Sequence, residues 1–254
     1  MQASNNNQHT SEPAIPVASG RLGSWHLSLG RYAQHPDELK RRYDAAAREW
    51  PGTARRFGLE PAYARALNQS GAPGILTSAG ARACALDCGI GSGSLTLALN
   101  STLPRPITYH GVDTSPAMLE TAGAALAEKK LAGELHESDI RRLPFADKTY
   151  DVVMAAHVLE HLSDPHLGIA EMARVLKPGG LLFACMTRRS WFGTAIQLLW
   201  RTWAVTAVEG VRWLTVCQLV DIGLCTVSLG ALAGGASIAF WARRPVETTL
   251  EIIQ

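Results

Sequence analysis

The chain has 254 residues and a mass of 27.3 kDa, which suits one α/β domain with a cap or at most two small domains. Its apolar content of 47% allows a substantial core, and its net charge of +2 predicts neither a nucleic-acid partner nor an acidic one. Five cysteines without a C-x-x-C pair are typical of a reducing compartment, so we expect a cytoplasmic protein with free, buried thiols.

The N-terminal region divides into a tail and a helical part. Residues 1–20 are rich in Asn, Ser, Pro and Ala and lack both the charged start and the apolar run of a signal peptide, so we expect a disordered tail. Residues 21–80 are predicted to form a helical cap. Its first helix is expected from Asp37 to Pro51, and a second from Pro61 to Asn68. The first helix carries an apolar series at spacings of four, three and four residues: Leu39, Tyr43, Ala46 and Trp50.

Residues 85–93, Ala-Leu-Asp-Cys-Gly-Ile-Gly-Ser-Gly, read as a short apolar strand that runs through Asp87 into Gly89, Gly91 and Gly93. Glycines allow positive φ and a close approach of the backbone to a ligand. A helix predicted from Ser94 would point its free N–H groups back at the turn, which predicts an anion site. The third glycine comes one residue too early for G-x-G-x-x-G, and no G-x-x-x-x-G-K-[ST] is present. The turn therefore favours neither a dinucleotide nor a nucleoside triphosphate.

Further strands and acids follow in order. A strand over 109–113 ends in Asp113, about 20 residues after the glycines, where such folds place a carboxylate on ribose hydroxyls. A helix follows, with an N-cap at Ser115. Asp139 ends another short segment, and residues 150–156 form a strand apolar enough to be buried on both faces. The Gly-Gly turn in 176–180 precedes a fifth strand.

Residues 222–242 carry no charge and are long enough to span a bilayer, which takes about 20 apolar residues. Their glycines and hydroxyl residues favour a different interpretation. A Gly-Gly turn separates two β-type runs, 225–233 and 236–243, which predicts an antiparallel hairpin.

This ordered set resembles the class I S-adenosylmethionine-dependent methyltransferases over roughly residues 40–244. The matching motifs are 86–93, 111–115, 138–140 followed by 143–145, and 176–180. The resemblance implies an α/β fold: a Rossmann-like, mostly parallel seven-stranded sheet with helices on both faces, a C-terminal antiparallel hairpin and an N-terminal helical cap. The methyltransferase domain would span 81–254, with an apolar lid insertion at about 188–215.

The same resemblance implies S-adenosyl-L-methionine as the cofactor. The glycine turn would meet its methionine portion and Asp87 would orient its amino-acid end, while Asp113 would bind the ribose diol. Around the adenine, the resemblance implies that Asp139 binds the amino group and that the backbone N–H of Ile140 binds a ring nitrogen. Thr114 and Met118 would flank the ring. A polarizable thioether suits an aromatic face.

Two residues are candidates for catalysis. His157 follows the fourth strand, where open α/β sheets bind ligands, so it is a candidate to orient the acceptor or accept its proton. A half-buried structural histidine is the alternative. Tyr43 is a candidate to line the acceptor pocket or, alternatively, to anchor the cap. Residues 157–161 also match the H-x-x-E-H pattern of zinc peptidases. Because no distant acidic ligand can be identified, we assign no metal.

Residues 190–215 are rich in large apolar side chains and would form a lid over the acceptor, a dimer contact or a peripheral membrane contact. We therefore predict methyl transfer to a small, fairly apolar acceptor at S, O or N by in-line displacement. C-methylation of a quinone-like ring, or cofactor binding without methylation, are the alternatives. Monomer and homodimer both stay open.

Overall fold

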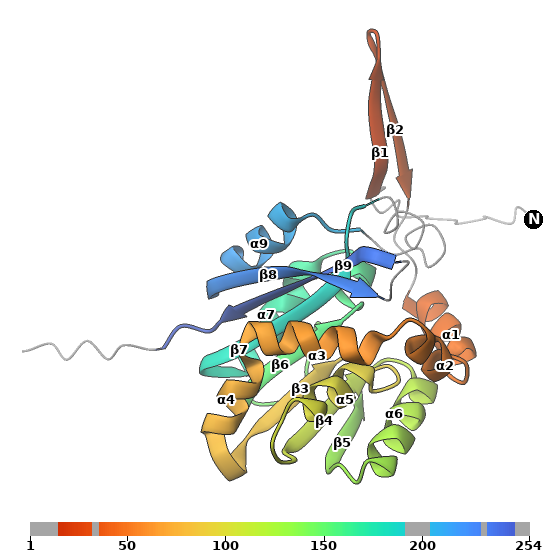
Figure 1. Cartoon of the computed structure of the whole chain (residues 1–254). Helices are drawn as coiled ribbons and strands as arrows, with labels where there is room; N and C mark the ends of the chain where they lie inside the picture. The colour runs from red at the N-terminus through yellow and green to blue at the C-terminus, as the bar shows by residue number, and fades with distance from the viewer. Residues whose placement is uncertain (1–14, 32–35, 191–203, 230–232, 247–254) are drawn as a thin grey trace, which may run out of the picture.

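The computed structural model describes residues 15–31, 36–190, 204–229 and 233–246 (Figure 1). The strands are β1 (Ile15–Leu22), β2 (Trp25–Arg31), β3 (Cys84–Cys88), β4 (Thr108–Asp113), β5 (Gly133–Glu137), β6 (Tyr150–Ala156), β7 (Leu176–Thr187), β8 (Val220–Leu229) and β9 (Ala233–Arg243). The α-helices are α1 (Pro36–Ala46), α2 (Trp50–Arg56), α3 (Leu59–Ser70), α4 (Ala72–Ala79), α5 (Ser94–Ser101), α6 (Pro116–Glu128), α7 (Pro165–Val175) and α9 (Ala207–Val216). Gly80–Arg82 and Leu159–His161 are single 3₁₀ turns.

Seven strands form one sheet in the order β5-β4-β3-β6-β7-β9-β8. The first five are parallel, and β9 pairs antiparallel with both β7 and β8. The chain fills one half outward from β3 and then returns to β6 on its other side, which creates the switch point where open α/β sheets bind ligands. This confirms the predicted mostly parallel, seven-stranded α/β fold with a C-terminal hairpin.

Helices cover both faces of the sheet (Figure 1). On one face, α3, α4, α5 and α6 pack against side chains such as Tyr109 and Phe183. On the other face, α7 and α9 pack against Leu86, Val153 and Phe240. Consecutive strand residues therefore serve opposite cores, as the two-residue period of a strand requires.

The N-terminal region differs from the prediction. β1 and β2 form a separate antiparallel hairpin, so residues 15–20 belong to a strand rather than to a disordered tail, and residues 21–31 are not helical. Residues 1–14 lie outside the described part. Of the expected cap, α3 and α4 belong to the layer on the sheet, and α1 packs on α6.

The helix expected to end at Pro51 is two helices. The first ends at Ala46, and α2 begins at Trp50 with Pro51 in its first turn. Proline is tolerated there because the first-turn N–H groups have no helical acceptor, so it opens a helix rather than closing one.

The C-terminal hairpin is present, but its turn is not at the predicted glycines. Gly234 and Gly235 lie inside β9, where Gly235 has φ +71°. Across the described ranges, no helix is long and apolar enough to cross a membrane.

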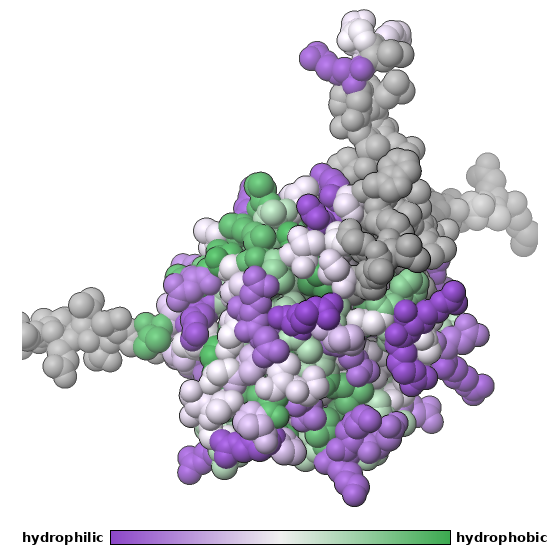
Figure 2. Space-filling model, viewed as in Figure 1, coloured by the Kyte–Doolittle hydropathy of each residue, from purple (hydrophilic) through white to green (hydrophobic). Residues whose placement is uncertain are grey.

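The second half of the predicted lid is helix α9, which packs on one face of the sheet. Residues 191–203 lie outside the described residues, but α9 buries Trp213 and Leu214 against the sheet. Its outer side leaves Val208 and Val216 exposed, and apolar surface gathers over this helix (Figure 2). The segment 207–215 is therefore a covering helix rather than a lid.

Two helical glycines make a matched stability test. A Cβ on Gly210 would lie 2.3–2.7 Å from three ring atoms of Phe240, whereas one on Gly123 in α6 would meet only Leu135, at 3.6 Å. Replacing a helical glycine by alanine stabilises the helix by about 1 kcal/mol, but forcing an extra methyl group into a packed core costs about 1–3 kcal/mol. We expect Gly210→Ala to lower the free energy of unfolding in urea, and Gly123→Ala to leave it unchanged or raise it. Equal effects of the two substitutions would contradict the packing of α9.

Candidate functional site

The glycine turn is a tight, positive-φ connection between β3 and α5. Gly89, Gly91 and Gly93 have φ of 71°, 52° and 83°, values that only glycine adopts at low cost. Gly89 is also held by packing, because a Cβ there would lie 2.1 Å from Val158 Cγ2. Its N–H and that of Ile90 donate to the carbonyl of Val112, at 2.7 and 2.9 Å. The turn is thus fixed against the end of β4.

Asp113 closes this arrangement from the end of β4. Its Oδ2 accepts from the N–H of Gly91 and its Oδ1 from the N–H of Ser115, both at 2.9 Å. Burial raises the pKa of Asp113, and these backbone hydrogen bonds act against that rise. Each carboxylate oxygen has two acceptor positions, so the side chain keeps capacity for ligand hydroxyls.

Asp87 lies at the end of β3 and is almost completely buried. Its Oδ2 accepts from Thr96 Oγ1 of α5 at 2.7 Å. Burial raises the pKa of Asp87 to about 7, although the hydrogen bond from Thr96 favours the ionised form. The carboxyl group is therefore close to half-ionised near neutral pH and responsive to a bound cation.

The residues predicted around the adenine follow β4 and β5. Thr114 is exposed, whereas Met118 is buried in the first turn of α6. Asp139 binds its neighbour Arg141 in a fork with contacts of 2.5–3.1 Å, and that hydrogen bonding lowers its pKa. Ile140 is buried beside it. The structure therefore keeps these residues near the carboxyl ends of neighbouring strands, and their adenine contacts stay predictions.

Helix α1 docks onto this edge of the sheet through polar contacts. Ser115, the N-cap of α6, donates through Oγ to Asp44 at 2.5 Å. Lys40 pairs with Glu137 at the end of β5, at 2.6 Å. Tyr43 lies between Lys40 and Asp44 in the sequence, and its hydroxyl is 2.8 Å from Nε2 of His161. Sequence reasoning missed Asp44 and His161, because both of these contacts join segments far apart in the chain.

His157 stands at the end of β6 in a polar cluster. Its Nδ1 donates to Glu160 Oε1 at 2.8 Å, and Nε2 lies 3.4 Å from Ser237 Oγ. Glu160 Oε1 also accepts from the N–H and Oγ of Thr187, at 3.0 and 2.9 Å. Burial alone would lower the pKa of His157, but the adjacent Glu160 raises it to about 10. Glu160 was missed at first, and the carboxylate three residues after the histidine in H-x-x-E-H was the signal for it.

Two tyrosines, the half-buried Tyr43 and the buried Tyr63, lie among these acids. Burial raises the pKa of Tyr43, and the charges of Glu160 and Asp113 raise it further. Burial likewise raises the pKa of Tyr63, together with Cys185, Glu160 and Asp87. Tyr43 of α1 therefore lies near Asp113 and Glu160, and Tyr63, whose ring is 6.5 Å from that of His157, lies near Asp87 and Glu160.

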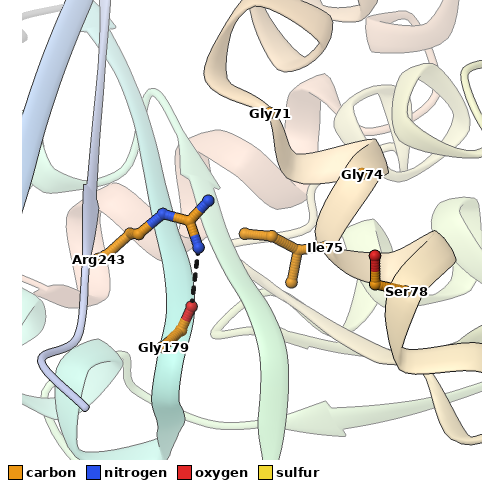
Figure 3. A pocket seen from close by; sticks show the side chains of 6 residues that line it. All are labelled: Gly71, Gly74, Ile75, Ser78, Gly179 and Arg243. Atoms are coloured by element: carbon orange, nitrogen blue, oxygen red, sulfur yellow. Dashed lines mark hydrogen bonds between the residues drawn. The ribbon is translucent and has the colours of Figure 1, made fainter.

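A cavity of about 450 Å³ lies elsewhere, between α4 and the start of β7 (Figure 3). Arg243 lines it and donates to the carbonyl of Gly179 at 3.2 Å. In the register of β7, Arg243 pairs with Leu181 and Ser237 with Thr187, so this cavity is at the opposite end of the sheet from His157. Within the described ranges, no group of three or more His, Cys, Asp or Glu residues could hold a metal ion.

Comparison with known proteins gives related sequences. A family model described as a methyltransferase domain matches residues 86–184. The demethylmenaquinone methyltransferase of Deinococcus radiodurans is 36% identical over 97 residues, which are 38% of this chain and 40% of that protein. The demethylmenaquinone methyltransferase of Desulfitobacterium hafniense is 27% identical over 82% of this chain and 88% of that protein. The match with the first of these spans about two fifths of its length.

Solved structures share the fold. A Haloferax volcanii protein described as a putative methyltransferase, in complex with a methyltransferase activator, superposes with a TM-score of 0.59 at 18% identity, over 80% of this chain and 97% of that one. Geranyl diphosphate C-methyltransferase from Streptomyces coelicolor, bound to S-adenosyl-L-homocysteine, gives 0.55 at 15% identity, over 70% and 79%. The stretch that holds the glycine turn thus matches a methyltransferase domain, and the fold along most of the chain is shared with solved methyltransferases; both findings support a class I S-adenosylmethionine-dependent methyltransferase.

Proposed function

We propose that the protein transfers a methyl group from S-adenosylmethionine to a small, fairly apolar acceptor. The observation that carries this proposal is the contact between Asp113 and Gly91, which joins a ribose-type acid to a positive-φ glycine turn at the switch point of the sheet. S-adenosylmethionine has no phosphate, so the early third glycine of the turn is compatible with it.

Each donor residue has a chemical role. Asp113 binds the ribose diol, and Asp87, in its ionised form, attracts the ammonium group of the amino-acid end. Asp139 and Ile140 hold the adenine edge, with Thr114 and Met118 beside the ring. These roles use carboxylates where the donor offers hydroxyl or N–H groups and apolar side chains where it offers an aromatic face.

Catalysis of such a displacement depends on positioning. The acceptor atom must approach the methyl carbon opposite the sulfonium, and holding both in line supplies roughly 7–11 kcal/mol. His157 and Tyr43 are the candidates to orient the acceptor, because they come near the donor acids from two different elements. The electron pair of the broken bond stays on sulfur and gives S-adenosylhomocysteine.

C-methylation of a quinone-like ring is the second candidate. Several relatives are named demethylmenaquinone methyltransferase, which favours an apolar ring as acceptor. The large apolar side chains of residues 191–203 and the exposed valines of α9 suit such an acceptor, as a lid or as a contact with the lipid surface from which it comes.

The test uses the full chain with methyl-labelled S-adenosylmethionine and two acceptor panels. One panel holds thiols, phenols and amines, and the other holds reduced quinone-like rings. Mass spectrometry should find the label on one panel, together with S-adenosylhomocysteine. Donor binding without product on either panel would favour the non-methylating alternative, and calorimetry that detects no binding of donor or S-adenosylhomocysteine would overturn the proposal.

Asp113→Ala should weaken S-adenosylhomocysteine binding by about 10- to 100-fold, because hydrogen bonds to a charged group contribute about 1.5–3 kcal/mol. Calorimetric titration measures the affinity, and thermal unfolding without ligand checks that the turn persists. The control is Glu120→Ala, which removes an exposed acid of the neighbouring helix α6 and should bind as the wild type does. Unchanged affinity of Asp113→Ala would refute the ribose assignment.

Asp87→Asn should separate stability from binding. The folded carboxyl group has a pKa of about 7, whereas an unfolded aspartate titrates near 3.9, so stability falls as pH rises from about 4 to 7. The asparagine variant has no charge to bury. At pH 8 it should be more stable by on the order of 1 kcal/mol or more, about 2–4 °C in Tm, yet bind S-adenosylhomocysteine more weakly. The stability difference should shrink at pH 5, and a constant difference would exclude titration of Asp87 as its cause.

A further inference from the structure

Glu160 is a buried carboxylate with unequal oxygens. Its side chain is completely buried, and Oε1 receives all the hydrogen bonds found for the carboxylate, from His157 and from two donors of Thr187. Oε2 is buried and has no hydrogen-bond partner among the described residues. A carboxylate in this setting is costly unless a positive charge lies beside it.

The charge that balances Glu160 comes from histidine. His157 makes the direct contact and His161 acts on Glu160 through space, and both lower its pKa against the effect of burial. No lysine or arginine contacts Glu160 in the described part of the chain. Because a carboxylate only accepts hydrogen bonds, Nδ1 of His157 must carry a proton, and a second proton on Nε2 makes the pair neutral overall.

The His157 ring is held in place, but the side chain is not completely buried. Its backbone has φ 57°, in the left-handed region that non-glycine residues rarely adopt, and its N–H donates to the carbonyl of Cys185 at 2.8 Å. Strain of this kind is typical of functional positions. The side chain is 25% exposed, with Nε2 3.4 Å from Ser237 Oγ and the ring 6.5 Å from that of Tyr63.

We propose that Glu160 is a positioning residue that keeps His157 as an imidazolium, and that His157 Nε2–H binds the anionic oxygen or sulfur of the methyl acceptor. The acceptor class is then a phenol, enol or thiol that binds as its anion. This inference rests on the proposed methyl transfer and replaces a general-base role for His157 by a charge-stabilising one.

The step balances without a base. The acceptor loses its proton to water before it binds, and a lone pair of its anionic atom forms the bond to the methyl carbon. The S–CH₃ bond breaks and its electron pair stays on sulfur, so the sulfonium becomes a neutral thioether. His157 keeps both protons throughout. Its charge compensates that of the acceptor in the same way that fixed donors stabilise anions in other active sites.

Nitrogen NMR on the full chain tests the imidazolium. The groups that face the pair are Thr187, Cys185, Ser237, Tyr63, Tyr43 and His161. The resonances of His157, identified by their loss in His157→Gln, should show both ring nitrogens protonated from pH 6 to pH 8.5. In Glu160→Gln the same ring should titrate near its ordinary pKa of about 6.5, a more than 100-fold change in proton affinity.

The control for this titration is Glu171→Gln. Glu171 also forms an ion pair three residues away along the chain, with Arg174 on α7, and its loss should leave His157 unchanged. Titration of His157 near pH 6.5 in the wild type overturns the proposal by itself, even if Glu160→Gln does not fold. So does an unchanged His157 in folded Glu160→Gln.

A chromogenic acid tests the acceptor class. We would titrate 4-nitrophenol and 4-nitrothiophenol, whose anions absorb visible light, with enzyme saturated by S-adenosylhomocysteine. The bound probe should favour its anion at least 10-fold more than in water, and His157→Gln and Glu160→Gln should lose this preference while Glu171→Gln keeps it. Absence of a preference for the anion, or of probe binding, overturns this inference. Failure of S-adenosylhomocysteine to bind would instead overturn the proposed function.

Discussion

The hydrogen bond from the Gly91 N–H to Asp113 fixes the part of the molecule where we propose that S-adenosylmethionine binds. It joins the turn after β3 to the end of β4, and the second oxygen of Asp113 holds the start of α6 through Ser115. Ser115 in turn binds Asp44 of α1. One carboxylate therefore aligns the turn and one helix directly, and its neighbour brings a second helix over them. A ligand that binds Asp113 meets a surface whose parts are already fixed relative to one another.

Burial of acids is the second constraint. Asp87, Asp113 and Glu160 all lie at the carboxyl ends of the strands or just beyond them; Asp87 and Glu160 are almost completely buried, and Asp113 is partly buried. They are satisfied differently: Asp87 by one hydroxyl, Asp113 by backbone N–H groups and Glu160 by a histidine. Burial raises the pKa values of Asp87 and Asp113, so a cationic or hydroxyl ligand would stabilise their ionised forms. Glu160 already has His157 beside it. In the proposed function, the donor is bound by Asp87 and Asp113, which lack a counter-ion, and the acceptor faces His157, the counter-ion of Glu160.

Sequence reasoning predicted the secondary structure around the glycine turn well because its signals are local. The strand, turn and helix of residues 84–101 and the acid at the end of β4 follow from periodicity, glycine chemistry and an N-cap within a few residues of each other. It failed where the outcome depends on distant contacts. Pro51 opens a helix instead of ending one, and Trp213 covers the sheet instead of a ligand. A proline can open or end a helix, and a tryptophan can pack on a sheet or on a ligand. The sequence alone does not name the packing partner that decides, such as Phe240 under α9.

The residues around His157, where we propose that the acceptor binds, come from segments far apart in the chain. Tyr43 and Tyr63 come from α1 and α3, Glu160 follows β6, and Thr187 and Ser237 face each other across β7 and β9. The family model covers residues 86–184, so it includes the glycine turn, Asp113 and the His157–Glu160 pair but none of the other four. The flanking residues therefore lie outside the part of the chain that the family model describes. Under the proposed role of His157, the pair selects acceptors that supply an anion, and the flanking segments then determine which of these molecules fits around it.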